Sequence, residues 1–154
     1  DRSHLGHARV LLVHARSAFR DEGVSVENNM PFVSAPLAFV FNGELHGVRI
    51  AERGRIGAEK LFRFLTRDLD GADNLRRGVE TVEMRSRRVR AMNFVIGAPG
   101  RFLVCCWFNE DPHYFTPFAR RGRDSAVVCS RPLGDESGWR PIGNHTVEEI
   151  PWFS

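Results

Sequence analysis

The sequence predicts an α+β domain built mainly from antiparallel sheets, and three observations predict it. Strand-like apolar runs come first along the chain, two amphipathic helical segments follow between residues 57 and 84, and short apolar runs separated by Gly, Pro, Asn and Asp fill the rest. A block of helices between two blocks of strands is typical of layered α+β domains, whereas a parallel βαβ repeat alternates the two. We expect residues 1–154 to form a single domain.

The first part of the chain contains one strand signal, a long irregular stretch and a candidate hairpin. Residues 10–16, "VLLVHAR", are typical of a buried strand, and residues 17–34 lack a sustained period and predict a long loop. In "LAFVFNGELHGV", residues 37–48, Asn42-Gly43 separates two apolar runs, which favours a β-hairpin turn with a second strand to about Ile50. The alternative is that the Asn amide and the Gly N–H act as hydrogen-bond donors to a reacting oxygen.

Two helices are expected next. An apolar stripe at helical spacing predicts the first one, with Glu59, Lys60, Arg63 and Arg67 on the opposite face. The stripe consists of Ala58, Leu61, Phe62, Leu65 and Leu69. Asp73 is a candidate cap for the second helix, whose inward positions are Leu75, Val79 and Val82.

The rest of the chain predicts strands and turns. Residues 85–90, "RSRRVR", are typical of a solvated helix end, with an RNA contact as the alternative. Runs such as "RAMNFVI" and "RFLVCCWF" then indicate an antiparallel meander. Cys105 and Cys106 are adjacent in one such run, so they point to opposite faces of a strand and are expected to be buried, unreactive thiols.

Composition excludes several classes of function. A net charge of +3 is too small to argue for nucleic acid, and no apolar run approaches the roughly 20 residues of a membrane span. The N-terminal residues do not resemble a secretory signal, so we expect a cytoplasmic protein. His4 and His7 have no further ligand at suitable spacing, and neither a metal nor another cofactor is expected.

Three segments in order resemble the motifs of class II glutamine amidotransferases. They are "HARSAF" (residues 14–19), "ENNMPF" (27–32) and "FVFNGEL" (39–45), and the resemblance continues through "GAEKLFRFL", "NFVIGAPGRFLVCCWF" and "AVVCSRPLGDESGWRPI". It covers nearly the whole chain. The resemblance implies the N-terminal-nucleophile (Ntn) hydrolase fold, an αββα layered sandwich.

The resemblance also implies site residues. Arg16 would clamp the α-carboxylate of the substrate, for which a guanidinium fork is well suited, and Asn42 with Gly43 would form the oxyanion hole. The implied reaction converts glutamine or a γ-glutamyl amide to the acid plus ammonia or an amine. Ammonia from such domains normally passes to a synthase partner, so a partner subunit is expected.

The chain departs from the family at the nucleophile. The family uses a cysteine at the first residue, whereas this chain begins with Asp1, and its first residues already match the strand that leads into the arginine motif. The N-terminal strands and the nucleophile are therefore expected to be missing, and this chain alone to be inactive. Either they are supplied by a longer or split enzyme, or the chain is a non-catalytic binding or scaffold module.

Further departures affect the expected pocket. Gly57 stands where the family has an acid that binds the substrate's α-amine, while Phe19 and Met30 replace a threonine and a histidine. The true substrate is therefore open between glutamine and another amide, and Glu27 or Glu44 could supply the lost carboxylate. His14 and His46 flank the expected pocket, where structural hydrogen bonding is favoured over acid–base chemistry.

Overall fold

The protein is described by a computed structural model covering residues 10–15, 25–135 and 137–152. The chain forms, in order, a 3₁₀ turn η3 (Val26–Asn28), two strands, two helices, and then six strands with one short helix among them. The first strands are β1 (Phe32–Ser34) and β2 (Leu37–His46), and the helices are α1 (Gly57–Thr66) and α2 (Ala72–Met84). The later elements are β3 (Arg88–Ala98), β4 (Arg101–Cys106), α3 (Pro112–Phe115), β5 (Phe118–Arg121), β6 (Ala126–Cys129), β7 (Arg140–Pro141) and β8 (Thr146–Pro151).

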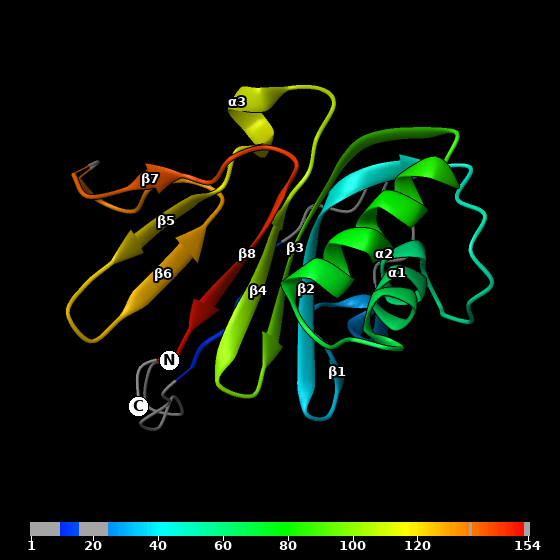
Figure 1. The fold of residues 1–154 in the computed structure, drawn as a ribbon, viewed down its shortest axis with the longest axis horizontal. Coiled ribbons are helices and arrows are strands. Elements are labelled where there is room, and N and C mark those ends of the chain that lie inside the picture. Colours follow the sequence, from blue (N-terminus) through cyan, green and yellow to red (C-terminus); the bar gives the residue numbers. More distant parts are fainter. Residues whose placement is uncertain (1–9, 16–24, 136, 153–154) are drawn as a thin grey trace.

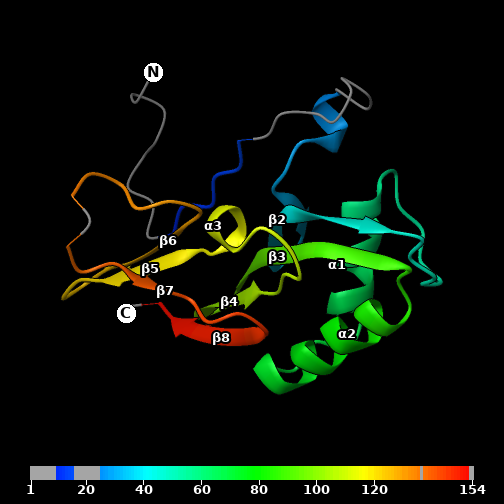
Figure 2. The same ribbon diagram turned by 90° about the horizontal axis from the view of Figure 1, so that it is seen from above.

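The elements form three layers. A five-stranded antiparallel sheet has the order β1-β2-β3-β4-β8, and a second sheet has the order β6-β5-β7. Helices α1 and α2 cover one face of the larger sheet and the smaller sheet lies on its other side (Figures 1 and 2). The predicted α+β class with mainly antiparallel sheets is therefore confirmed.

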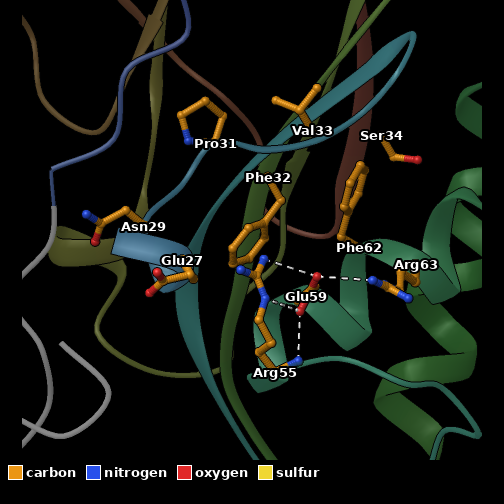
Figure 3. Close-up of a pocket in the computed structure, with 10 residues that line it drawn as sticks. All are labelled: Glu27, Asn29, Pro31, Phe32, Val33, Ser34, Arg55, Glu59, Phe62 and Arg63. Carbon is orange, nitrogen blue, oxygen red and sulfur yellow. Dashed lines mark hydrogen bonds and ion pairs between the residues drawn. The ribbon is translucent and has the colours of Figure 1, made fainter. Parts of the chain in front are cut away.

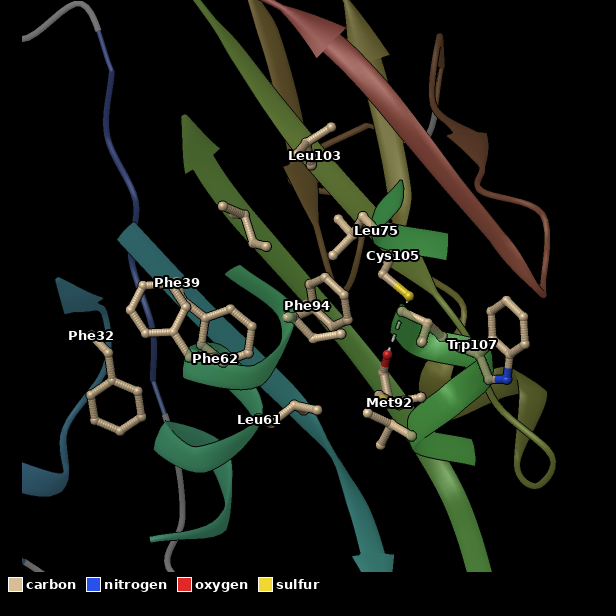
Figure 4. Close-up of a cluster of buried hydrophobic side chains, with 14 of the residues drawn as sticks. Phe32, Phe39, Leu61, Phe62, Leu75, Met92, Phe94, Leu103, Cys105 and Trp107 are labelled. Carbon is tan, nitrogen blue, oxygen red and sulfur yellow. Dashed lines mark hydrogen bonds between the residues drawn. The ribbon is translucent and has the colours of Figure 1, made fainter. Parts of the chain in front are cut away.

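The larger core lies between the helices and the five-stranded sheet (Figure 4). Phe39 of β2 is fully buried, and its ring stacks on Phe62 of α1 with centroids 5.0 Å apart and contacts Phe94 of β3 at 5.5 Å. Burying each such side chain contributes about 1.5–3 kcal/mol. The predicted inward positions of α2, Leu75, Val79 and Val82, are all fully buried, as its helical spacing required.

A second core lies between the two sheets, where Val104, Cys106 and Ile150 of the larger sheet meet Ala119 and Phe115. Cys105 belongs to the first core and Cys106 to the second, which confirms that adjacent cysteines on β4 point to opposite faces. Burial raises the pKa of the Cys105 thiol and raises that of Cys106 to about 12. Both thiols are therefore held in their unreactive, protonated form.

The predicted hairpin at Asn42-Gly43 is wrong. Strand β2 continues through both residues, with Asn42 opposite Asn93 and Gly43 opposite Met92 of β3, and the chain turns earlier, between Ser34 and Leu37. Gly43 is needed for close packing: a Cβ there would lie 2.2 Å from the carbonyl oxygen of Ala91. The Asn-Gly pair thus reflects tight strand packing and not a turn.

Three further expectations differ from the structure. Residues 10–15 form no strand, and Leu11 and Val13 are 62% and 70% exposed, because no described strand pairs with them. The expected loop over residues 17–34 contains β1 at its end, where Phe32 pairs with Phe39. Helix α2 is preceded by Gly71, so Asp73 lies in the first turn and is not the cap.

Helix α1 confirms the expected apolar stripe with one exception. Leu61, Phe62 and Leu65 are buried, but Glu59, expected on the solvent face, is only 7% exposed. Arginines on both sides of Glu59 in the sequence cover its carboxylate. Among the described residues no helix has the length and apolar content needed to cross a membrane.

Candidate functional site

A cavity of about 550 Å³ opens beside the second half of β2, beyond the point where β1 ends. Its walls come from β2, the segment that follows it, the first turn of α1, one residue of β3 and the short helix α3. The lining residues are Phe41–His46, Val48, Ile50, Gly57, Ala58, Lys60, Leu61, Arg90, Tyr114 and Phe115. The cavity therefore contains Asn42, Gly43, Glu44, His46 and Gly57, all of which the sequence had singled out.

The register of β2 sets the position of Asn42. Asn42 lies opposite Asn93, which is buried and holds α3 against the sheet by donating from its side-chain amide to the Phe115 carbonyl. Asn93 also accepts a hydrogen bond from the Trp107 N–H at 2.8 Å. Residues directly opposite in a ladder share a face, so Asn42 lies on the α3 side of β2. Its side-chain amide makes no hydrogen bond within the described part of the chain.

The backbone N–H and C=O of Gly43 face the open edge of β2, which is the edge away from β3 beyond the end of β1. The carbonyl oxygen of Phe41 accepts a hydrogen bond from His14 Nε2 at 3.0 Å, so the backbone of Phe41 points away from β3. Backbone groups of alternate residues in a strand point the same way, and Gly43 is two residues further on. Its N–H is thus directed toward the side of β2 where the cavity lies.

An ion-pair network forms the polar wall. Glu44 lies 2.6 Å from His46 Nε2 and 3.0 Å from Arg90 Nη1, and Arg90 also pairs with Asp111. The hydrogen bonds from Arg90, and then from His46, lower the pKa of Glu44. The carboxylate of Glu44 is therefore ionised and already has two partners in the structure.

The α1 wall has the opposite character. Gly57 begins the helix, and a Cβ at this position would meet no atom within 4 Å, so the space beside it is open. Ile56 precedes the helix and provides no side-chain cap. Lys60 makes no ion pair with a described residue. This wall thus carries a lysine and the positive end of the α1 dipole, and no carboxylate.

The structure separates some predicted residues from the cavity. Glu27 lines a different cavity, beside β1, so only Glu44 remains in place to replace the missing acid. Arg16 and Phe19 lie outside the described residues. None of the chain's three cysteines lines the cavity, and no group of three metal-ligating side chains occurs among the residues that the structure describes.

Sequence reasoning missed the α3 wall and Arg90. The run "HYFTPFA", residues 113–119, predicts a strand after a turn at 109–112, whereas the structure has helix α3 there. Asp111-Pro112 is a helix-start signal, because proline suits the first helical position. Arg90 belongs to a run that predicts a solvated helix end, and the acids that accept hydrogen bonds from it lie 21 and 46 residues away. Sequence spacing gives no signal for such pairs.

Comparison with known proteins shows the fold. The structure is similar to the glutamine aminotransferase class-II domain protein from Silicibacter pomeroyi, with a TM-score of 0.58 and 15% identity over 81% of this chain and 72% of that one. It is also similar to a predicted glutamine amidotransferase from Pseudomonas aeruginosa PA01, with a TM-score of 0.56 and 14% identity over 82% of this chain and 63% of that one. The sequence matches no protein-family model and no curated protein.

The chain therefore has a class II glutamine amidotransferase-like fold. The described residues form three layers of this fold, namely the helices α1 and α2, the five-stranded sheet and the three-stranded sheet. At 14% and 15% identity the likeness establishes the arrangement of the chain. The chemistry must be argued from the cavity itself.

Proposed function

We propose that this chain forms the amide-binding part of a glutaminase-type hydrolase acting on glutamine or a γ-glutamyl amide. One observation carries the proposal: Asn42 and Gly43 line the same cavity, with the Gly43 N–H directed toward the open edge of β2. Two neutral donors fixed on a strand suit an oxyanion, because they need no rearrangement as negative charge develops on the oxygen.

In this proposal each residue acts on one part of the substrate. Asn42 and Gly43 donate to the amide oxygen when a thiolate adds to the carbonyl carbon and the C=O π electrons move onto the oxygen. Collapse of that intermediate breaks the C–N bond as the proton lost by the thiol passes to the nitrogen, so ammonia or an amine leaves and a thioester remains. Water then hydrolyses the thioester to the acid and the free thiol. Arg16 binds the α-carboxylate. The thiolate comes from a cysteine outside this chain, because Cys105 and Cys106 are buried and Cys129 lies on β6.

The charges of the cavity bear on the substrate's α-amine. No carboxylate stands at Gly57, and Glu44 is engaged by Arg90 and His46. An ammonium group would therefore have to compete with Arg90 for Glu44. The cavity fits an amide whose α-amine is blocked or absent better than it fits free glutamine.

A non-catalytic binding module is the second candidate. The described lining of the cavity holds no thiol, and the same donors would bind an amide without cleaving it. In either case the ligand is a small amide-bearing acid, and no organic cofactor or metal is needed for the chemistry. A synthase partner that receives ammonia belongs to the first candidate only.

Calorimetric titration tests the binding part of the proposal. Glutamine and an N-acetylated γ-glutamyl amide are titrated into wild type, Arg16→Ala, Asn42→Ala and the control Asn109→Ala, whose side chain is exposed and bonds Glu83 and Val89. We expect Arg16→Ala to weaken binding at least tenfold, about 1.4 kcal/mol, and the control to bind as wild type. Equal affinity in wild type and Arg16→Ala would contradict the clamp.

The parent gene separates the two candidates. A Met-Cys start upstream of Asp1 supports the enzyme, and the longer protein should then release ammonia. In that protein Asn42→Ala should lower the rate of release by about 10²–10³ while changing affinity little, because an oxyanion donor acts mainly in the transition state. A start codon directly ahead of Asp1 supports the binding module.

A further inference from the structure

The second cavity, about 490 Å³, lies between the edge strand β1 and helix α1 (Figure 3). Its apolar floor contains the buried rings of Phe32 and Phe62, and Pro31 and Val33 line it from the strand side. The polar groups on its walls are Glu27, Asn29, Ser34, Arg55, Glu59 and Arg63. A groove between a strand edge and a helix has the shape that extended peptides occupy when they add to a sheet.

Strand β1 offers backbone groups at this groove. β1 is the end strand of its sheet in the described part of the chain, so its outer edge has no strand partner there. The backbone N–H and C=O groups of Phe41 point away from β3, and those of Leu37 and Phe39 point the same way, toward β1. They therefore form backbone hydrogen bonds with the residues paired to them, Ser34 and Phe32. The N–H and C=O of Val33, between these pairs, must then point outward, and its side chain is 72% exposed.

The helix wall carries a fixed excess of positive charge. Glu59 accepts from the backbone N–H of Arg55 at 2.7 Å, from Arg55 Nε at 3.0 Å and from Arg63 Nη2 at 3.2 Å. These contacts, chiefly those of the Arg55 guanidinium, lower the pKa of Glu59 to about 2. One carboxylate thus faces two guanidinium groups that are both about half exposed, and N–H groups of Arg63 remain free of partners within the described residues.

The opposite wall carries the one opposing charge. Glu27 of η3 is exposed and close enough to Arg55 to interact with it electrostatically. The Arg55 guanidinium lies over the Phe32 ring at 5.7 Å, which fixes it on the floor of the groove. The Arg63 end is therefore the positive end of the groove, and the Glu27 end is negative.

From this arrangement we propose that the groove binds an extended segment of a partner polypeptide, which pairs with Val33 as an added strand and places an acidic group on Arg63. The backbone of Val33 supplies affinity that does not depend on sequence, and Arg63 supplies the preference for an acid. The proposal is independent of amide hydrolysis, because the groove beside β1 and the cavity that contains Asn42 have no lining residue in common.

Fluorescence polarisation with labelled peptides tests the proposal. The probe is Thr-Val-Asp-Val-Thr blocked at both ends, compared with versions in which Asp is replaced by Asn or Lys. We expect the Asp peptide to bind at least fivefold more tightly than the Asn peptide and the Lys peptide to bind most weakly. The Asn peptide blocked only at its N-terminus keeps a free C-terminal carboxylate. It shows whether the end of a chain can supply the acidic group in place of Asp.

Matched variants locate the binding. Arg63→Gln should remove the preference for Asp, whereas Arg76→Gln, which removes a similarly exposed arginine from an i,i+4 pair on α2, should not. Glu27→Gln should tighten binding of the Asp peptide. Val33→Pro, which removes the outward N–H, should weaken all peptides at least tenfold, and Val33→Thr should not.

Circular dichroism melts establish that each variant is folded. Failure of every peptide to bind saturably, equal affinity for the Asp and Lys peptides, or binding unchanged by both Arg63→Gln and Val33→Pro would overturn the proposal. None of these results bears on the cavity that contains Asn42 and Gly43.

Discussion

At the scale of single residues, the sequence misled about the local structure of Asn42-Gly43, and the role of the pair as hydrogen-bond donors stays a prediction. An Asn-Gly pair is the usual residue choice for a tight turn, yet here it lies inside β2. Local sequence could not reveal this, because the reason is the approach of Ala91 from β3, 48 positions further along the chain. Gly57, by contrast, lies in the expected place because it follows from counting along a helix.

Replacing Gly43 tests the close approach directly. Gly43→Ala places a Cβ 2.2 Å from the Ala91 carbonyl oxygen, and we expect it to lower the free energy of unfolding by about 3 kcal/mol. Gly57→Ala is the matched control, since its Cβ meets nothing within 4 Å and alanine favours the helix by up to about 1 kcal/mol. Urea titrations of both variants measure the difference, and a Gly43→Ala protein as stable as wild type would refute the packing argument.

The pKa of Glu59 predicts how the stability of the protein depends on pH. Its pKa is about 2 in the folded protein against an ordinary value of 4.5, so its contribution to stability is complete above pH 4.5 and is lost as the pH falls toward 2. We expect Glu59→Gln to lower the free energy of unfolding by about 2 kcal/mol at pH 7, since it breaks charge-assisted hydrogen bonds.

The difference between wild type and Glu59→Gln should shrink steadily between pH 4.5 and pH 2 in denaturant titrations. Glu80→Gln is the control, because Glu80 is 45% exposed in its pair with Arg76. This substitution should change the free energy of unfolding by less than about 0.5 kcal/mol. A difference in the free energy of unfolding between wild type and Glu59→Gln that stays constant down to pH 2 would mean that the arginines do not bind the Glu59 carboxylate.

At the scale of elements, periodicity succeeded where one face of an element is apolar. It located both helices, their buried positions and the alternation of Cys105 and Cys106. The apolar run over residues 10–16 predicts a buried strand, and this prediction is wrong, because no described strand pairs with residues 10–15. Strand formation depends on a partner far along the chain, whereas a helix bonds within itself, so this asymmetry is expected.

Thiol labelling tests the position of β4 between two layers. Both Cys105 and Cys106 are shielded only if the helices cover one face of β4 and the second sheet covers the other. Brief iodoacetamide treatment of the native protein, read by peptide mass spectrometry, should leave both unlabelled, and treatment in urea should label both. Cys129, which is only partly buried, is the internal reference. Labelling of Cys106 in the native protein would contradict the packing of the second sheet.

At the scale of the whole molecule, the order of strands, helices and strands predicted the layered α+β fold, and the structure and its likeness to two solved structures confirm it. The candidate site was predicted only in part. Asn42, Gly43, Glu44 and Gly57 meet at one cavity, but Arg90 and the α3 wall arise from contacts between distant segments. That the chain is one domain, and that Arg16 completes the site, remain predictions.

We propose that Asn42 and Gly43 together hold the oxygen of an amide substrate. A crystal structure of the protein with an N-acetylated γ-glutamyl amide tests this arrangement. We expect the ligand beside β2, with its amide oxygen about 3 Å from both the Asn42 side-chain nitrogen and the Gly43 backbone nitrogen. A ligand bound elsewhere, or with that oxygen directed away from both donors, would contradict it.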